Sequence, residues 1–412
     1  MTEISPLATT TIGSRIEKLL ALQPPGRSPL QPFYTDPAIY AEDLERFLFR
    51  HWICAGHVSS LAAPGDFFTV EFAGESVILV RGRDNEIRAL ANVCRHRGSR
   101  VCLERSGNTR LFICPYHAWA YHLDGSLRAA RDMGPEFGRE DHGLRQLQVR
   151  IAGGLIFFTF ADQPPDFSAA QEVITTVARA YGWETAKVAL RKSWRIAANW
   201  KLAVENYLEC YHCGPSHPEF SEIHSNDQSP EKVADLFAAM QAEAAAQGLD
   251  LPETDLWGIA AGEDREPVWC KRFALLDGAR SGSAGGEPVA PLMGQFTRYD
   301  GGTTYLNMGP VSYSLSYPDH TVIYRFIPHG VSECEMEILW LVHGEAEAGR
   351  DYDPEALSWM WVVTSEADKR ITEDNQKGVN SRYYQPGPLA VMEGRQRRFV
   401  EWYLAGMGRA AD

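Results

Sequence analysis

Between about Asp66 and Asp162, the chain consists of short apolar or alternating runs separated by turn residues. Strands with one or both faces buried give this pattern. The runs include FFTVEF, SVILVRG, IRALANV and VRIAGGLIFFTF. This part of the sequence therefore predicts an all-β domain.

The pattern changes after Pro164 and Pro165. Helical periodicity predicts helices near 169–181, 199–212 and 230–248, and a long helix from about Pro354 to Val379. Between Thr303 and His343, several apolar runs follow one another with no helical segment between them, which predicts an antiparallel meander. The second domain should therefore mix helices with antiparallel sheet, and the fold class is α+β.

A length of 412 residues favours two or three domains. We predict an N-terminal segment (residues 1–45) that packs on the second domain, the β domain over 46–164, and the second domain over 165–412. Residues 278–287, GARSGSAGGE, form a Gly/Ser-rich loop that suits either a mobile lid or a plain surface connection.

Composition and charge narrow the choice of partners. A hydrophobic fraction of 44% and a charged fraction of 23% are typical of a folded globular chain. The net charge of −14 argues against nucleic acid but would not oppose a small cation. The start, MTEISPLATT, lacks the apolar core of a secretion signal, and no uncharged run is long enough to cross a bilayer. We therefore expect a cytoplasmic protein with no membrane partner.

The first candidate for chemistry is a pair of Cys-His motifs, Cys94-Arg95-His96 and Cys114-Pro115-Tyr116-His117, separated by seventeen residues. Two thiolates can hold one iron of a [2Fe–2S] cluster while two imidazoles hold the other. A Cys₂His₂ zinc site is the alternative. Zinc fingers, however, pair Cys with Cys and His with His and place the histidines on a helix. The alternating order on β loops therefore favours the cluster.

The remaining six of the eight cysteines are too sparse for a disulfide scaffold, so we expect them to be core or surface residues.

The second candidate lies in residues 199–217, NWKLAVENYLECYHCGPSH. Glu205, Glu209 and His212 are four and then three residues apart, so they would share one face of the predicted helix. Gly214-Pro215 should end that helix and turn His217 back toward His212. Two imidazoles beside inward-facing carboxylates predict a mononuclear metal site.

A facial triad that holds iron(II) needs one further carboxylate. The long C-terminal helix offers four of them: Glu366, Asp368, Glu373 and Asp374. Three have Lys or Arg at helical spacing and suit a solvated, ion-paired face. Asp368 has no such partner and lies on the side of Trp361 and Ile371, which makes it the expected third ligand.

The two Cys-His motifs resemble the Rieske domain of ring-hydroxylating and related oxygenases, including Arg97-Gly98 after the first motif and Trp119 after the second. The resemblance extends over nearly the whole chain, and it includes a Glu-x-x-Gln-x-Gly run (373–378) after Asp368. It implies a [2Fe–2S] cluster on the two Cys-His pairs and a mononuclear iron, which activates O₂, on His212, His217 and Asp368.

The same resemblance implies a helix-grip (START-like) catalytic domain and a head-to-tail homotrimer. The cluster of one subunit would then serve the iron of its neighbour. Glu209 would be the bridge, accepting hydrogen bonds from His212 of its own chain and from a cluster histidine, expected to be His117, across the interface.

Electron supply should come from a separate protein. Because no GxGxxG run follows a predicted strand, NAD(P)H must be oxidised by a flavin- or ferredoxin-type reductase. Five arginines against one glutamate between Cys94 and Cys114 suit the docking of an acidic redox partner, although ordinary surface arginines would look the same.

Over its full length the chain most resembles the subgroup that acts on quaternary ammonium compounds, and within it the stachydrine (proline betaine) N-demethylases. Glu209, where many members have Asp, is shared with this subgroup. The implied reaction hydroxylates an N-methyl group and releases formaldehyde. Aromatic faces would bind the ammonium group, and Tyr207, Tyr305 and Tyr324 are the candidates.

Glycine betaine, carnitine, choline and a neutral aromatic ring remain rival substrates. A non-enzymatic zinc or electron-transfer protein is the rival class.

Overall fold

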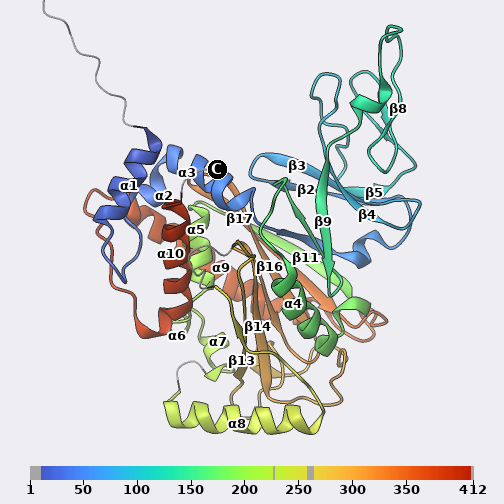
Figure 1. Ribbon diagram of the computed structural model, residues 1–412. Coiled ribbons are helices and arrows are strands. Elements are labelled where there is room, and N and C mark those ends of the chain that lie inside the picture. The colour runs from blue at the N-terminus through green and yellow to red at the C-terminus, as the bar shows by residue number, and fades with distance from the viewer. Residues whose placement is uncertain (1–10, 226–227, 258–263, 410–412) are drawn as a thin grey trace, which may run out of the picture.

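The computed structural model describes residues 11–225, 228–257 and 264–409, so the first ten residues, on which the expectation of no secretion signal rested, lie outside it. Figure 1 shows two large antiparallel sheets, each seven-stranded, and a three-stranded sheet above the first of them. In the described part of the chain, no helix is long and apolar enough to cross a membrane.

The first sheet has the order β1-β10-β9-β4-β3-β2-β5. Its strands are β1 (Ile53–His57), β2 (Asp66–Phe72), β3 (Glu75–Arg81), β4 (Ile87–Ala91), β5 (Ser106–Asn108), β9 (Gln146–Ala152) and β10 (Leu155–Thr159). The small sheet consists of β6 (Phe112–Ile113), β7 (Ala120–Tyr121) and β8 (Leu127–Ala129). The predicted all-β domain is therefore confirmed, and β1 lies before the first strand that the sequence pattern predicts, which begins near Asp66.

The second sheet has the order β11-β17-β16-β15-β14-β13-β12. Its strands are β11 (Lys187–Ile196), β12 (Thr254–Asp255), β13 (Val268–Ala274), β14 (Gly302–Met308), β15 (Ser312–Ser316), β16 (Thr321–Gly330) and β17 (Glu333–Val342). Strands β14 to β17 pair in sequence order and antiparallel, so the predicted meander is confirmed.

Helices cover both faces of this second sheet (Figure 1). They are α4 (Ser168–Tyr181), α5 (Trp200–Tyr207), α6 (Cys213–Ser216), α7 (Pro218–Ser221), α8 (Pro230–Ala246), α9 (Pro354–Val379) and α10 (Gly394–Met407). Alternate residues of a strand point to opposite faces. Leu306 and Met308 accordingly share a core with α4, whereas Tyr305 shares a core with Trp361 of α9. The α9 face carries the candidate site.

The helix predicted over 199–212 is wrong beyond Tyr207, where α5 ends. The Glu209 carboxylate accepts hydrogen bonds from the backbone N–H groups of Tyr211 and His212. A continuing helix would have bound those N–H groups to carbonyl oxygens four residues earlier. Gly214-Pro215 also does not break a helix, because both residues lie inside the short α6.

The Gly/Ser-rich loop over 278–287 is anchored to the catalytic domain. Ser281 and Ser283 are buried, and the Ser281 hydroxyl donates to Asp319 at 2.7 Å. A Cβ at Gly282 would meet the rings of Tyr317 and Trp361 at 2.5 and 2.7 Å, so the backbone is held close to the aromatic core. Of the two alternatives, this packing favours a connection over a lid.

The N-terminal segment folds as α1 (Ile12–Leu22), α2 (Pro32–Thr35), α3 (Pro37–Asp43) and a π-helical turn (Leu44–Leu48). It packs beside α5 and α10 (Figure 1).

Two buried carboxylates attach this segment to the catalytic domain. Asp43 is ion-paired with Lys201 and accepts from the Trp200 indole at 3.2 Å and the Tyr403 hydroxyl at 2.7 Å. Glu205 accepts from the Tyr34 hydroxyl at 2.9 Å and from Gln396 at 3.0 Å.

Glu205 supplies a test of this arrangement. Burial raises the pKa of its carboxyl to about 7, and the hydrogen bonds from Tyr34 and Gln396 offset burial only in part. A carboxyl whose pKa is raised on folding contributes stability at low pH, and that contribution is lost as the pH rises through the folded pKa. The pH range over which this stability is lost therefore runs from the ordinary pKa of glutamate, about 4.5, to about 7.

Glu205→Gln should gain stability relative to the unsubstituted protein across that window, by up to about 3 kcal/mol. Urea unfolding at a series of pH values measures the difference. Glu222→Gln, at an exposed glutamate beyond α7, is the control and should show a flat difference. Parallel pH profiles for Glu205→Gln and the unsubstituted protein would contradict the shift.

Candidate metal centres and the adjoining pocket

The two Cys-His motifs form the same backbone turn. In each, the N–H four residues after the cysteine donates to the cysteine carbonyl, at 2.9 Å from Gly98 to Cys94 and at 3.0 Å from Ala118 to Cys114. Both donors have positive φ, 76° at Gly98 and 56° at Ala118. Positive φ is unfavourable for alanine, so the surrounding structure must hold this turn in place.

These turns place two sulfur and two nitrogen donors at one tip of the β domain. Cys94 and Cys114 are buried beside each other, whereas His96 and His117 are exposed. The two histidine Nδ1 atoms lie 3.1 Å apart, close to the roughly 3.3 Å expected for two imidazoles on one tetrahedral metal. The Tyr121 hydroxyl lies 3.2 Å from the Cys94 sulfur. The donor set therefore fits a [2Fe–2S] cluster with its imidazoles on the outer side.

Large apolar side chains, here called the apolar rim, are exposed in or next to the two segments that carry the histidines. Tyr116 stacks on His117 with ring centroids 4.0 Å apart. The rim consists of large apolar side chains that are each at least 41% exposed: Val93, Leu103, Ile113 and Tyr116. Such an exposed group is typical of a surface that another protein covers.

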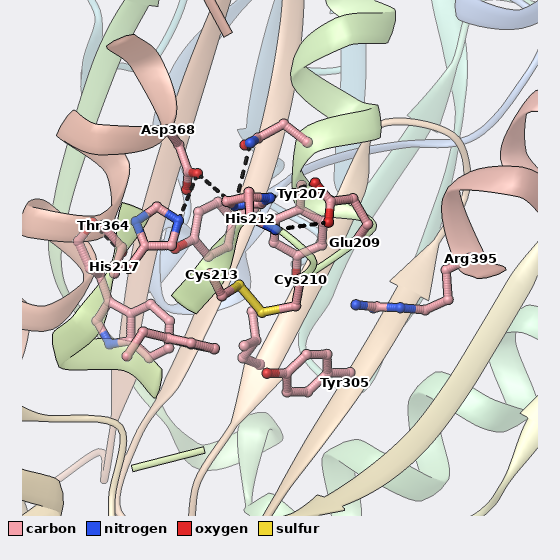
Figure 2. Close-up of a pocket in the computed structure, with 15 residues that line it drawn as sticks. Tyr207, Glu209, Cys210, His212, Cys213, His217, Tyr305, Thr364, Asp368 and Arg395 are labelled. Atoms are coloured by element: carbon pink, nitrogen blue, oxygen red, sulfur yellow. Dashed lines mark hydrogen bonds and ion pairs between the residues drawn. A yellow bond between two sulfur atoms is a disulfide. The ribbon is translucent and has the colours of Figure 1, made fainter. Parts of the chain in front are cut away.

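The second centre lies where α9 passes the segment after α5 (Figure 2). The Nε2 atoms of His212 and His217 lie 3.2 and 3.1 Å from Oδ1 of Asp368. That oxygen is buried but has no hydrogen bond of acceptable geometry. Ligands at adjacent corners of an octahedron with bonds of about 2.1 Å lie about 3 Å apart. Both distances therefore fit the predicted set of three iron(II) ligands.

Glu209 fixes the orientation of His212. Its carboxylate lies 2.5 Å from Nδ1 of His212, which leaves Nε2 facing Asp368. Burial lowers the pKa of His212, but the nearby carboxylates of Asp368 and Glu209 outweigh burial and raise the pKa to about 9. A carboxylate behind a metal-ligating histidine commonly has this orienting role.

The other acids of α9 are engaged elsewhere. Glu366 accepts from the Trp194 indole at 2.7 Å, a partner that helical spacing did not predict. Glu373 accepts from the Ala197 N–H at 2.9 Å and is ion-paired with Lys369. Asp374 is ion-paired with Lys377 at 2.8 Å. Of the four candidate acids, the structure brings Asp368 to the histidine pair.

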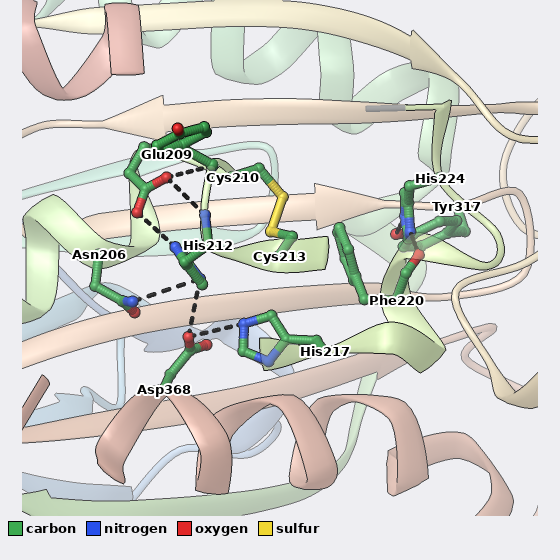
Figure 3. The surroundings of a disulfide bond; sticks show 11 residues. Asn206, Glu209, Cys210, His212, Cys213, His217, Phe220, His224, Tyr317 and Asp368 are labelled. Atoms are coloured by element: carbon green, nitrogen blue, oxygen red, sulfur yellow. Dashed lines mark hydrogen bonds and ion pairs between the residues drawn. A yellow bond between two sulfur atoms is a disulfide. The ribbon is translucent and has the colours of Figure 1, made fainter. Parts of the chain in front are cut away.

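A disulfide joins Cys210 to Cys213 on either side of His212, with Cα atoms 4.9 Å apart (Figure 3). The expectation that these two cysteines are unpaired is therefore wrong. A donor atom of Cys213 also lies within 4.8 Å of those of His212 and His217. Because its sulfur is bonded to Cys210, it is no thiolate ligand, and Asp368 remains the better third donor.

A cavity of about 60 Å³ opens beside the three ligands. A single buried water needs roughly 10–15 Å³ on the same measure, so the space suits one small molecule. The three predicted tyrosines, Tyr207, Tyr305 and Tyr324, all line it.

Phe220, Trp361 and Arg395 also line the cavity, and sequence reasoning missed all three as pocket residues. Arg395 lies in no motif, so no sequence signal pointed to it.

Two family models match this chain. The Rieske [2Fe–2S] domain matches residues 51–148, and the ring hydroxylating alpha subunit (catalytic domain) matches residues 183–409. The chain therefore belongs to the Rieske-type non-haem iron oxygenases, as an alpha subunit. It is an oxidoreductase that uses a [2Fe–2S] cluster, a non-haem iron and O₂, with electrons from a separate reductase.

Two curated relatives are similar to this chain over most of its length. The chain is 35% identical over 382 residues to the glycine betaine monooxygenase oxygenase subunit of Pseudomonas aeruginosa, covering 92% of this chain and 88% of that one. It is 39% identical over 364 residues to the carnitine monooxygenase oxygenase subunit of Escherichia coli K12, covering 85% and 84%.

Solved structures share the fold. A quaternary ammonium Rieske monooxygenase superposes with a TM-score of 0.72 at 23% identity, covering 95% of this chain and 97% of that one. Naphthalene 1,2-dioxygenase from Rhodococcus superposes with a TM-score of 0.66 at 18% identity, covering 97% and 99%.

Replacing Cys114 with Ser should abolish the visible absorption of the cluster and its acid-labile sulfide, because one iron loses a thiolate. Mononuclear iron should remain, since His212, His217 and Asp368 lie in the other domain. Cys102→Ser, at another buried cysteine of the β domain, is the control and should keep the spectrum. Zinc in place of iron and sulfide at the Cys-His site would contradict the assignment.

Asp368→Ala should lose mononuclear iron and all oxygenation while it keeps the colour of the cluster. Asp374→Ala makes the same change six residues further along α9, at a side chain that is 65% exposed, and should keep both metals and activity. Iron analysis and product formation measure both variants. Full iron content in Asp368→Ala would show that another residue is the third ligand.

Proposed function

We propose that this chain is the oxygenase component of a monooxygenase that hydroxylates an N-methyl group of a quaternary ammonium betaine, with stachydrine (proline betaine) as its substrate. The observation that carries the proposal is the small, aromatic-lined cavity beside the three ligands. The named substrates of the relatives, glycine betaine and carnitine, belong to the same chemical class.

Aromatic faces suit this substrate. A quaternary ammonium group has no N–H to donate, so a cavity can recognise it by cation–π attraction. Trp361 has Phe220 and Tyr324 beside it, each with ring centroids 6.4 Å away. Tyr207 packs on Tyr324 at 4.9 Å. These rings form the wall next to the ligands. The small volume also disfavours a polycyclic aromatic substrate.

Two separate sets of residues would bind the two metal centres. Cys94, His96, Cys114 and His117 hold the cluster, which stores one electron at a time. His212, His217 and Asp368 hold the iron, which supplies open positions for O₂ when it is bound. The surrounding chain positions the N-methyl group and excludes water.

The reaction balances with two electrons from NAD(P)H. An N–CH₃ group, O₂, two electrons and two protons give N–CH₂OH and water. The N–CH₂OH carbon–nitrogen bond then breaks, so that formaldehyde, the tertiary amine and a proton are released. The reductase is a separate protein, and the exposed arginines beside the cluster, such as Arg95 and Arg97, offer it a docking surface.

Electron transfer would cross between subunits of a homotrimer. The exposed imidazoles and their apolar rim present the cluster outward. Beside the other centre, Tyr211 is 62% exposed and follows Glu209 by two residues. Glu209 would accept a hydrogen bond from a cluster histidine of a neighbouring subunit, expected to be His117, while it holds His212 of its own chain.

A substrate screen tests the proposed activity. The protein, with a suitable reductase and NADH, should release formaldehyde from stachydrine and form the tertiary amine. Proline, which has the same ring but no N-methyl group, is the control. Faster turnover of glycine betaine, carnitine or choline would show that another quaternary ammonium compound, and not stachydrine, is the substrate. Formaldehyde from none of the methylated ammonium compounds would refute the proposal.

Glu209→Gln tests the bridge. Both metals should stay bound, but electron transfer to the mononuclear iron should slow roughly 10-fold or more, because the carboxylate that orients His212 loses its charge. Single-turnover kinetics of the reduced protein measure the rate. Glu222→Gln, at an exposed acid, should leave the rate unchanged. Normal single-turnover kinetics in Glu209→Gln would remove Glu209 from the electron path.

A further inference from the structure

Arg395 extends from the start of α10 into the same cavity as the candidate iron ligands. Figure 2 shows its guanidinium pointing inward from the side opposite Asp368. The residue as a whole is half-buried, but its Nη1 atom is shielded from solvent and has no hydrogen-bond partner. A donor hidden in this way is rare in folded proteins unless something else binds to it.

In the part of the chain that the structure describes, the guanidinium of Arg395 is not paired with a carboxylate. Its observed neighbours are the faces of Trp269 and Tyr305, with centroids 5.0 and 5.3 Å from Cζ. Glu209 acts on Arg395 electrostatically, but the two side chains form no ion pair, and the Glu209 carboxylate contacts His212 and the N–H of Tyr211 instead.

The two buried arginines among the described residues of the catalytic domain, Arg272 and Arg325, are each paired with a carboxylate. Arg272 has Asp300, and Arg325 has Glu337 with an N···O distance of 2.7 Å from Nε. An arginine keeps its charge at any ordinary pH, and a buried charge normally requires a partner. Arg395 departs from this rule, and it does so beside the candidate iron ligands.

We propose that Arg395 binds the carboxylate of the substrate, so that the oxygenase selects zwitterions over simple quaternary ammonium cations. The inference rests on the proposed function and narrows its substrate class. A guanidinium presents two parallel N–H donors that match a carboxylate. Choline, which has a hydroxyl in place of the carboxylate, lacks the group that Arg395 binds.

Arg395 also sets the orientation of the substrate. Its positive charge attracts the carboxylate and repels the ammonium group. The ammonium end is therefore directed toward the opposite wall, where Tyr324 and Trp361 lie beside the candidate ligands. Because Arg395 already covers one face of Tyr305, that tyrosine acts as a support for the guanidinium and not as a binding face for the ammonium group.

The test compares a carboxylate ligand with its neutral amide. Stachydrine and its carboxamide have nearly the same shape, but only the first is a carboxylate. Their dissociation constants are measured by calorimetry on the anaerobic holoenzyme, and KM and kcat follow from formaldehyde release. The unsubstituted protein should bind the carboxylate about 100-fold more tightly than the carboxamide. Equal affinity for the two ligands would overturn the proposal without any variant.

Arg395→Met should abolish this preference by raising the dissociation constant of the carboxylate while that of the carboxamide changes little. Arg395→Lys keeps the charge but loses the paired donors, so it should restore part of the preference. Arg398→Met is the matched control, because Arg398 lies on the same helix, is 51% exposed and is paired with Asp255. It should retain the full preference.

Two results would show a structural role instead: an equal loss of affinity for both ligands in Arg395→Met and Arg395→Lys, or an undiminished preference in Arg395→Met. Failure of the proposed function is distinguishable. If the unsubstituted protein prefers the carboxylate through Arg395 but releases no formaldehyde, the demethylase assignment fails and the carboxylate site stands. If formaldehyde is released with no dependence on Arg395, the carboxylate site alone fails.

Discussion

The packing of α9 across one face of the second sheet determines where chemistry can take place in this molecule. Trp361 and Met360 bury their side chains against that face, which fixes the rotation of the helix. With this rotation, Asp368 points at the segment after α5, where His212 and His217 lie. A rotation of one residue, about 100°, would direct a different side chain at the histidines.

Much of the fold could be predicted, because burial imposes a period on the sequence. The meander and α9 were identified within a residue or two of their observed bounds. The structure of the segment from Glu209 to His217 was harder to predict, because side-chain hydrogen bonds replace the helical ones there. The carboxylate of Glu209 and the Cys210–Cys213 disulfide shape this turn, and no periodic pattern encodes either of them.

In the candidate site, too, some residues could be predicted from the sequence and others could not. The Cys-His spacing is local, so the sequence could predict Cys94, His96, Cys114 and His117 as one site, and the lack of a basic neighbour pointed to Asp368. Arg395 could not be found, since its significance lies in what it does not contact. It comes from a helix nearly two hundred residues away from His212, and an unpaired charge becomes visible only when all its neighbours are known.

The buried carboxylates Asp43 and Glu205 have a consequence for the order of assembly. Their partners are far apart along the chain, from Tyr34 to Tyr403. The β domain is complete by Thr159 and can fold while synthesis continues, since domains fold as units from the N-terminus. The support beneath α5 must wait for α10, which begins at Gly394, 235 residues after Thr159. The predicted cluster site can therefore form before the support of the predicted mononuclear site is complete.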